Sequence, residues 1–375
     1  MRHITQFILY TGFALLLYAC GTTKKSQNSQ PVVSIAFNAD SAYAFCAAQC
    51  QFGPRTMNSP AHEQCAQWIE QQFRRYGYDV QLQQADLRGY DGTVLHSTNI
   101  IATAASPSAA PSSADPSPSS PSAVPSAAAA SPSAAPSAAV PSPSSSSAVP
   151  SAAVPDGSPS GRILICAHWD SRPWADNDPD SANWRKPVMA ANDGASGVAV
   201  MLELARLLQQ HDSARVAVDF ICFDAEDWGI PQWEDRADGD SWALGAQYWA
   251  AHRGSTNYRY AILLDMVGGQ GARFYREGYS MQHARSIVEK VWQAAQSAGY
   301  GSFFIDKEGG YITDDHVPVN ETANIPCIDI INHYPDCPQG SFGPTWHTVS
   351  DDMQHIDRNT LEAVGQTLVQ LIFTE

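Results

Sequence analysis

Short apolar runs of strand length recur along this 375-residue chain, and segments with helical periodicity separate them. Six acidic or imidazole residues lie at the ends of such runs or in loops beside helices: His168, Asp193, Glu226, Asp227, Asp265 and His347. In an open α/β sheet, the carboxyl ends of the parallel strands meet at one edge, where ligands bind. The chain is therefore expected to bring these distant groups together at a single sheet edge.

The alternation of strands and helices predicts an α/β fold, a three-layer α/β/α sandwich with a mixed, mostly parallel central sheet. The expected strands are Asp79–Ala85, Leu95–Ala102, Arg162–Ala167, Val216–Phe223, Tyr260–Met266 and Cys327–Ile331. The expected helices are Ser41–Gln51, Ala61–Tyr76, Ser196–Gln209, Trp242–His252, Met281–Ser297 and Asn359–Phe373. Apolar residues share one face of the third and the last helix, as is typical of helices that pack on a sheet.

A stretch rich in Ala, Ser and Pro interrupts this pattern at residues 103–160. It has too few large apolar side chains to offset the entropy lost on ordering, so we expect it to be disordered. Because loop-closure entropy grows slowly with length, a single domain over residues 39–375 can tolerate it as a surface insertion. The strands expected at Leu95–Ala102 and Arg162–Ala167 could then pair as neighbours. The alternative is an interdomain linker.

The N-terminus has the features of an export signal. A basic start precedes an apolar stretch, Ile8–Leu17, which is too short to cross a membrane comfortably. Small residues then precede Cys20, as in the cleavage box of bacterial lipoproteins. We expect residues 1–20 to be a lipoprotein signal peptide, Cys20 to carry the lipid, and residues 21–38 to form a tether. No acidic run follows Cys20, so we expect a lipid-anchored protein of the bacterial cell envelope that faces the periplasm. An ordinary secretory peptide or a short anchor is the alternative.

Charge and cysteine content exclude other classes. The formal net charge of −16 argues against a nucleic-acid partner and against binding to anionic lipid through bulk charge. Apart from Cys20 the chain has an odd number of cysteines, so at least one thiol is unpaired in an oxidising compartment. No cysteine spacing matches a zinc finger, and we interpret these residues as structural.

Asp193, Asp227 and His347 together predict a catalytic metal site. Carboxylate and imidazole groups are good zinc ligands, and catalytic zinc has three protein ligands and one open position. Glu226 precedes Asp227 and should point elsewhere, because neighbouring side chains on an extended backbone diverge. That placement suits a general base beside the metal. The alternative role for Glu226 is a hydrogen-bond acceptor that orients a ligand.

Several segments carry a family resemblance: AHWD (167–170), ANDGASG (191–197), FDAEDWG (223–229), LLDMVGG (263–269), TDDHVP (313–318) and TWHTVSDD (345–352). They resemble the zinc exopeptidase superfamily, and most closely its glutaminyl cyclases (glutaminyl-peptide cyclotransferases), in particular the bacterial members related to the animal enzymes. HWDSRPWADND and PTWHTVSDD are the specific features, whereas NDGASG is shared with the peptidases. The resemblance runs from about Phe45 to the C-terminus and leaves out the Ala/Ser/Pro-rich stretch.

The resemblance implies an acyltransferase that cyclises N-terminal glutamine to pyroglutamate and releases ammonia. It implies one zinc ion per chain, held at the positions of Asp193, Asp227 and His347. The family often has Glu-Glu where this chain has Glu226-Asp227, so one ligand here sits on a shorter arm. The catalytic acids it implies are Glu226, Asp265 and Asp314, with Asp315 as the competing choice for the last. The aromatic residues it implies for the substrate pocket are Trp233, Phe342 and Trp346.

The substrates expected are peptides or proteins that begin with glutamine, and we expect a monomer. Trp233 fits the animal spacing only with a gap of one residue. The main alternative is a two-zinc aminopeptidase, because His168 and Asp265 stand where a second metal would bind, with Asp193 as the bridge. A third possibility is a lipid-anchored binding protein without turnover, which the intact Glu226 argues against.

Overall fold

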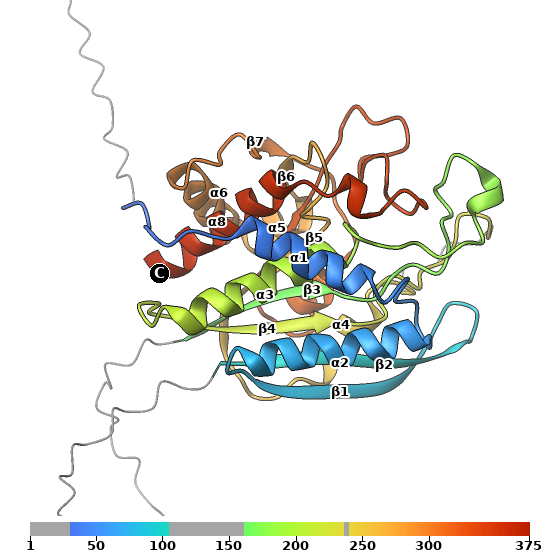
Figure 1. Ribbon diagram of the computed structural model, residues 1–375, viewed down its shortest axis with the longest axis horizontal. Coiled ribbons are helices and arrows are strands. Elements are labelled where there is room, and N and C mark those ends of the chain that lie inside the picture. The colour runs from blue at the N-terminus through green and yellow to red at the C-terminus, as the bar shows by residue number, and fades with distance from the viewer. Residues whose placement is uncertain (1–30, 105–160, 236–239) are drawn as a thin grey trace, which may run out of the picture.

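The computed structural model describes residues 31–104, 161–235 and 240–375. Within them, six strands form a sheet in the order β1-β2-β4-β3-β5-β8 (Figure 1). The strands are β1 (Asp79–Arg88), β2 (Val94–Thr103), β3 (Arg162–His168), β4 (Ala217–Phe223), β5 (Tyr258–Asp265) and β8 (Cys327–Ile331). Strands β4, β3, β5 and β8 run parallel, whereas β1 and β2 pair antiparallel. The predicted mixed, mostly parallel sheet is confirmed.

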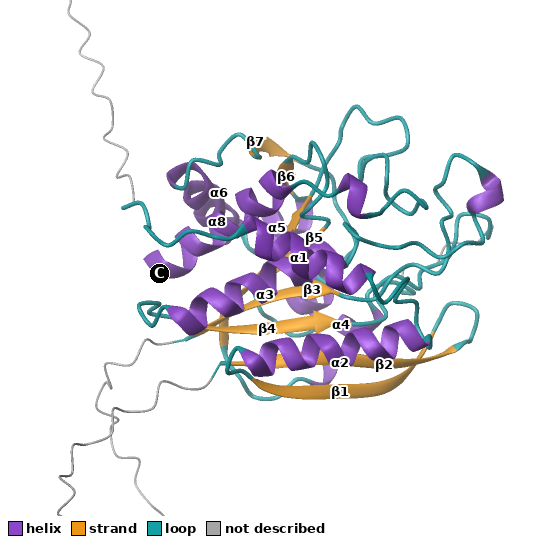
Figure 2. Ribbon diagram, viewed as in Figure 1, coloured by secondary structure: helices purple, strands orange, loops and turns teal. Residues whose placement is uncertain are grey.

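Helices cover both faces of this sheet (Figure 2). The larger core packs helices α1 (Ala39–Cys50), α2 (Pro60–Arg75), α3 (Ala195–Gln210), α6 (Arg285–Ser297) and α8 (Arg358–Thr374) on one face. The smaller core lies on the other face, under α4 (Leu244–His252) and α7 (His316–Glu321). Side chains alternate along β3, so Ile163 and Ile165 join the first core and Leu164 joins the second. The three-layer sandwich follows from these central strands, which are apolar on both faces.

Two expectations about the elements are wrong. Strand β4 lies between β2 and β3, so the strands on either side of the Ala/Ser/Pro-rich stretch share a sheet but do not pair with each other. The helix expected at Met281–Ser297 is divided into α5 (Gly278–His283) and α6 at Ala284, whose φ and ψ of −141° and 35° are not helical. The sequence patterns also missed a small second sheet of β6 (Phe274–Arg276) and β7 (Phe304–Glu308).

The two ends of the Ala/Ser/Pro-rich stretch are held at one point on β4. The backbone N–H of Ala104 donates a 2.9 Å hydrogen bond to the Asp219 carboxylate. Arg162 donates to the same carboxylate through Nε at 2.7 Å, and through Nη2 to the carbonyl of Ala104 at 2.7 Å. The signal peptide, Cys20 and nearly all of the expected insert lie outside the described residues.

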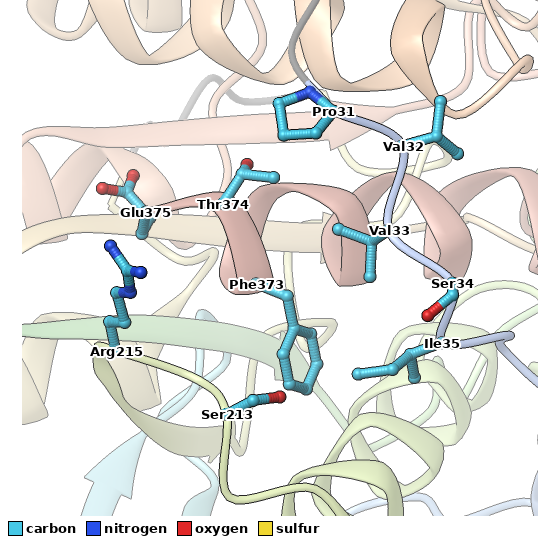
Figure 3. A pocket seen from close by; sticks show the side chains of 10 residues that line it. All are labelled: Pro31, Val32, Val33, Ser34, Ile35, Ser213, Arg215, Phe373, Thr374 and Glu375. Carbon is cyan, nitrogen blue, oxygen red and sulfur yellow. The ribbon is translucent and has the colours of Figure 1, made fainter.

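Residues 31–38, the described part of the expected tether, lie along α8. Gln370 accepts a hydrogen bond from the N–H of Val33 and donates one to the carbonyl of Pro31. Phe37 is buried against Gly365, where a Cβ atom would come within 2.4 Å of its ring. A cavity of about 490 Å³ remains between this segment and the end of α8 (Figure 3). Across the described ranges, no helix is both long and apolar enough to span a bilayer.

Candidate active site

A cavity of about 220 Å³ opens at the carboxyl edge of the parallel strands. His168 and Asp265 end β3 and β5, and Glu226 follows β4 by three residues. The residues that line the cavity are Asp193, Glu226, Trp242, Asp265, Met266, Ile312, Thr313, Asp314, Ile331, Phe342, Trp346 and His347. Segments from across the chain therefore converge at this edge.

Asp193, Asp227 and His347 form one buried cluster, which we call the outer triad. One ligand atom from each lies within 4.8 Å of the others. The Nε2 atom of His347 is 3.2 Å from Asp227 Oδ1 and 3.5 Å from Asp193 Oδ2. Asp227 Oδ2 is buried and has no hydrogen-bond partner among the described residues. A buried carboxylate oxygen without a partner, beside an imidazole and a second carboxylate, fits a zinc ion.

Buried carboxylates fix the loops that carry this triad. Asp351 accepts hydrogen bonds from the N–H groups of Asn192 and Asp193 at 2.8 and 3.0 Å. Asp170 accepts from those of Glu226 and Asp227 at 3.1 and 3.3 Å. These contacts order the backbone before any metal binds, which lowers the entropic cost of binding.

The backbone at the triad is also strained. His347 has φ of 54° and Ala225 has φ of 53°, in the left-handed region that side chains with a Cβ rarely adopt. Each costs about 1 kcal/mol or more. The turn at Ala225 brings both Glu226 and Asp227 to the site directly after the end of β4. The turn at His347 places its ring beside Asp193 and Asp227, the other two members of the triad.

His168, Asp193 and Asp265 form a second cluster, the inner triad. Asp193 belongs to both triads, because its Oδ1 is 3.0 Å from His168 Nε2 while its Oδ2 faces His347. His168 Nε2 is also 3.3 Å from Asp265 Oδ1, and Nδ1 is 3.5 Å from Asp170. Burial lowers the pKa of His168, but the neighbouring carboxylates of Asp170, Asp193 and Asp265 raise it more, to well above its usual value. The neighbouring carboxylates therefore favour the protonated form of His168.

Glu226, Asp265 and Asp314 form an acidic wall of the cavity. Burial raises the pKa of Glu226 well above its usual range, and the charges of Asp227 and Asp314 raise it further. Burial and the nearby carboxylates also raise the pKa of Asp265, to about 8. Acids this close titrate together and share protons. Asp315 is fully buried but does not line the cavity, so Asp314 is the acid that faces it.

The aromatic wall agrees only partly with the sequence-based prediction. Phe342 and Trp346 both line the cavity, with ring centroids 4.6 Å apart, and Trp346 stacks on His347 at 3.8 Å. Trp233 does not line it. It stacks with Trp184 and lies 3.9 Å below the guanidinium of Arg185.

Trp242 lines the cavity in place of Trp233, with its ring nearly parallel to that of His347 at 5.9 Å. The sequence-based prediction missed it, because spacing counted along a loop says little about which ring faces inward. Its position just before α4 is the one feature of the sequence that could have indicated that Trp242 lies at the site.

Arg172 is a second functional residue that the sequence patterns missed. Its buried guanidinium donates to both oxygens of Asp176 at 2.7 Å and to Asp227 Oδ1 at 3.3 Å. Asp176 in turn lies 3.7 Å from His347 Nδ1. This arrangement orients two members of the outer triad from behind, and no local pattern distinguishes such an arginine from a surface one.

Comparison with known proteins gives a family match. The model of the family described as "Peptidase family M28" matches residues 151–372. A solved structure of a glutaminyl cyclase from Bacteroides thetaiotaomicron, bound to N-acetylhistamine, is 40% identical with a TM-score of 0.74, over 91% of this chain and 99% of that one. A leucine aminopeptidase precursor from the same organism matches with the same identity and TM-score, over 92% of this chain and 100% of that one.

Two curated relatives match over shorter stretches. Aminopeptidase YwaD of Bacillus subtilis is 27% identical over 56% of this chain, and bovine glutaminyl-peptide cyclotransferase is 23% identical over 55% of it. The matched regions cover 40% and 60% of the lengths of these relatives. Cyclases and peptidases both appear among the relatives, so the choice between the two activities depends on the site itself.

Proposed function

Because this chain belongs to peptidase family M28 and is similar to bacterial glutaminyl cyclases over nine-tenths of its length, we propose that it converts N-terminal glutamine to pyroglutamate and releases ammonia. The observation that carries the proposal is the contrast between the two imidazoles. His347 lines the cavity beside Phe342 and Trp346, whereas His168 does not line it. One metal ion per chain fits that contrast.

Asp193, Asp227 and His347 would hold this zinc ion. When bound there, zinc supplies a Lewis acid that polarises the side-chain amide carbonyl of the substrate glutamine. Asp227 has a shorter side chain than the glutamate common in the family, and the hydrogen bond from Arg172 fixes its carboxylate in place. Outer contacts of this kind orient metal ligands and strengthen their binding.

Glu226 is the residue that moves protons. It accepts a proton from the attacking α-amine of the substrate and delivers one to the departing amide nitrogen. Its raised pKa suits both steps, because a carboxylate poised closer to neutral pH exchanges protons in either direction. Asp265 and Asp314, on the same wall, hold Glu226 and the nitrogen that leaves.

Phe342, Trp346 and Trp242 enclose the apolar part of the glutamine side chain. The substrate's own amine is the nucleophile, so the reaction needs no water. A small, aromatic-lined cavity keeps the folded side chain close to its amine, and ring closure then gains from proximity.

A two-zinc aminopeptidase is the second candidate, because the inner triad offers a further set of metal-ligand types. It would require His168 to lose its proton while three carboxylates surround it. His347 lines the cavity, whereas His168 does not, and we therefore place the single zinc in the outer triad.

The setting that we propose for the enzyme is the periplasmic side of a bacterial membrane. The anchor is a lipid on Cys20, which follows a lipoprotein-like signal. Exported peptides and proteins with N-terminal glutamine are the proposed substrates, and the proposed state is a monomer.

Mass spectrometry of a glutamine-initiated peptide tests the activity. The zinc-loaded enzyme should lower the peptide mass by one ammonia. A matched peptide that begins with alanine should keep its mass. Release of free amino acid from the alanine peptide, with no change at glutamine, would instead establish the aminopeptidase.

A further inference from the structure

A histidine behind the acidic wall has no role in the mechanism above. His316 begins α7 directly after Asp314 and Asp315, and none of its surface is exposed. Its Nε2 atom lies 3.1 Å from Glu277 Oε2, and its Nδ1 atom lies 4.0 Å from Asp329 Oδ2. One ligand-type atom each of Asp314, His316 and Asp329 lies within 4.8 Å of the others. The imidazole therefore stands between Glu277 and two further carboxylates.

Glu277 is built to remain ionised. Its carboxylate accepts hydrogen bonds from the N–H groups of Tyr279, Ser280 and Ile312 and from the Ser280 hydroxyl. Burial raises the pKa of Glu277, but the hydrogen bond with His316 and the others lower it to about 2. A buried carboxylate held by this many donors fixes the orientation of the His316 ring.

The opposite side of the imidazole faces groups that have no other partner. Both carboxylate oxygens of Asp329, Nδ1 of His316 and Oδ2 of Asp314 are buried without a hydrogen bond inside the ranges that the structure covers. After burial, which raises the pKa of Asp314, the charge of His316 has the largest effect and lowers it. His316 thus lies behind Asp314, within 4.8 Å of it, and lowers the pKa of that carboxyl.

We propose that His316, anchored by Glu277, is a positioning residue that holds Asp314 in the acidic wall for proton transfer by Glu226. The inference rests on the proposed cyclisation. His316 does not line the cavity, so it acts on the reaction only through Asp314. Loss of the imidazole would free Asp314 to turn away, while the aromatic wall and the outer triad keep their contacts.

Full-length, zinc-loaded variants His316→Asn and Glu277→Gln test this role. For His316→Asn we expect kcat to fall about tenfold to a hundredfold, as is typical when an outer residue that orients a catalytic group is lost. The KM for a glutamine peptide and the affinity for N-acetylhistamine should stay within about twofold, because His316 does not line the cavity. The double variant should be no slower than His316→Asn alone, because Glu277 acts through His316.

A surface pair provides the matched control. His283 and Glu321 also join α5 and α7, at 3.8 Å, with side chains 26% and 55% exposed. The variants His283→Asn and Glu321→Gln should keep the wild-type kcat. If His316→Asn does not fold, His316→Gln, whose longer amide can reach Glu277, replaces it in the same assay.

Three outcomes would overturn the inference. An unchanged kcat in His316→Asn, or a fall in zinc content and peptide affinity along with kcat, would show no role or a merely structural one. Loss of a second metal equivalent in this variant, with the outer triad still loaded, would make the cluster a cation site instead. A wild-type enzyme that leaves glutamine peptides unchanged removes both proposals, whereas an active wild type with an equally active variant removes only this one.

Discussion

The outer and inner triads share Asp193 and use the same kinds of side chain, but their surroundings differ. In the outer triad, His347 lies at the cavity and Asp227 keeps one buried oxygen without a partner in the described structure. In the inner triad, His168 lies within 3.5 Å of three carboxylates, which raise its pKa well above its usual value. His347 also has three carboxylates within 3.7 Å, so the comparison teaches that access to the cavity, which His347 has and His168 lacks, distinguishes the two imidazoles.

Removal of His347 should have the largest effect. We expect His347→Ala to lose bound zinc and to bring turnover to background, because only two carboxylate ligands remain in the outer triad. Metal analysis of the purified variant and the glutamine-peptide assay measure both effects. His355→Ala, on an exposed imidazole, is the control and should behave as wild type. Full zinc occupancy in His347→Ala would make the outer triad the wrong site.

Glu226→Gln should separate chemistry from metal binding. Loss of the group that moves protons is expected to lower kcat by about 10² to 10⁴-fold, with zinc content unchanged. Glu234→Gln changes an exposed glutamate on the following loop and should leave kcat unaltered. Turnover within about tenfold of wild type in Glu226→Gln would assign the proton transfer to another acid.

His168→Asn sharpens the comparison directly. If His168 is an imidazolium that only neutralises Asp193 and Asp265, the variant should keep its zinc and lose about tenfold in kcat. Metal content per chain measured beside kcat distinguishes the cases. A loss of half of the bound zinc would show that the inner triad also holds an ion, as a two-zinc peptidase requires.

Trp242→Ala should weaken substrate binding modestly. The ring lines the cavity next to His347, so its loss should raise KM about fivefold, with a smaller change in kcat. Trp233→Ala is the matched control, because Trp233 does not line the cavity. A larger KM effect from Trp233 would mean that substrate binds outside the cavity described here.

The stability of the zinc-free protein should depend on pH through Asp265 and Asp351. Burial and neighbouring charges raise the pKa of each from 3.8 to about 8, so each binds a proton more tightly when folded. This stabilising contribution of the two carboxyl groups is fully present below pH 3.8 and is lost as the pH rises to about 8. The melting temperature of the zinc-free protein should therefore fall by a few degrees between about pH 5 and about pH 8. Zinc should flatten this dependence, and a rising melting temperature would contradict it.

The sequence predicts the sheet better than the connections. Strand β8 occurs at the predicted residues, Cys327–Ile331, and β3 is one residue longer than predicted, because continuous apolar runs leave little choice of boundary. The break between α5 and α6 was missed because apolar periodicity continues through it. The side chain of Glu277, which caps α5, shows where that helix begins only once its partners are known.

The residues of the candidate site also divide into those that the sequence predicts well and those that it does not. Side chains at strand ends, such as His168 and Asp265, follow from the topology of a parallel sheet. The choice between Asp314 and Asp315 could not be made from two adjacent acids in a loop, and Trp242 depends on how a loop returns to the cavity. Arg172 and His316 act through contacts distant in sequence, for which a single chain gives no periodic signal.

The junction at Asp219 has a practical consequence. Since Ala104 and Arg162 both form hydrogen bonds with Asp219 on β4, we expect the domain to tolerate changes in the segment between them. A fluorescent protein or an affinity tag inserted at this junction should be carried by the enzyme without disturbing its active site. Because the hydrogen bonds at this junction hold both ends, we expect that the length of the segment between them can change while the catalytic site stays constant.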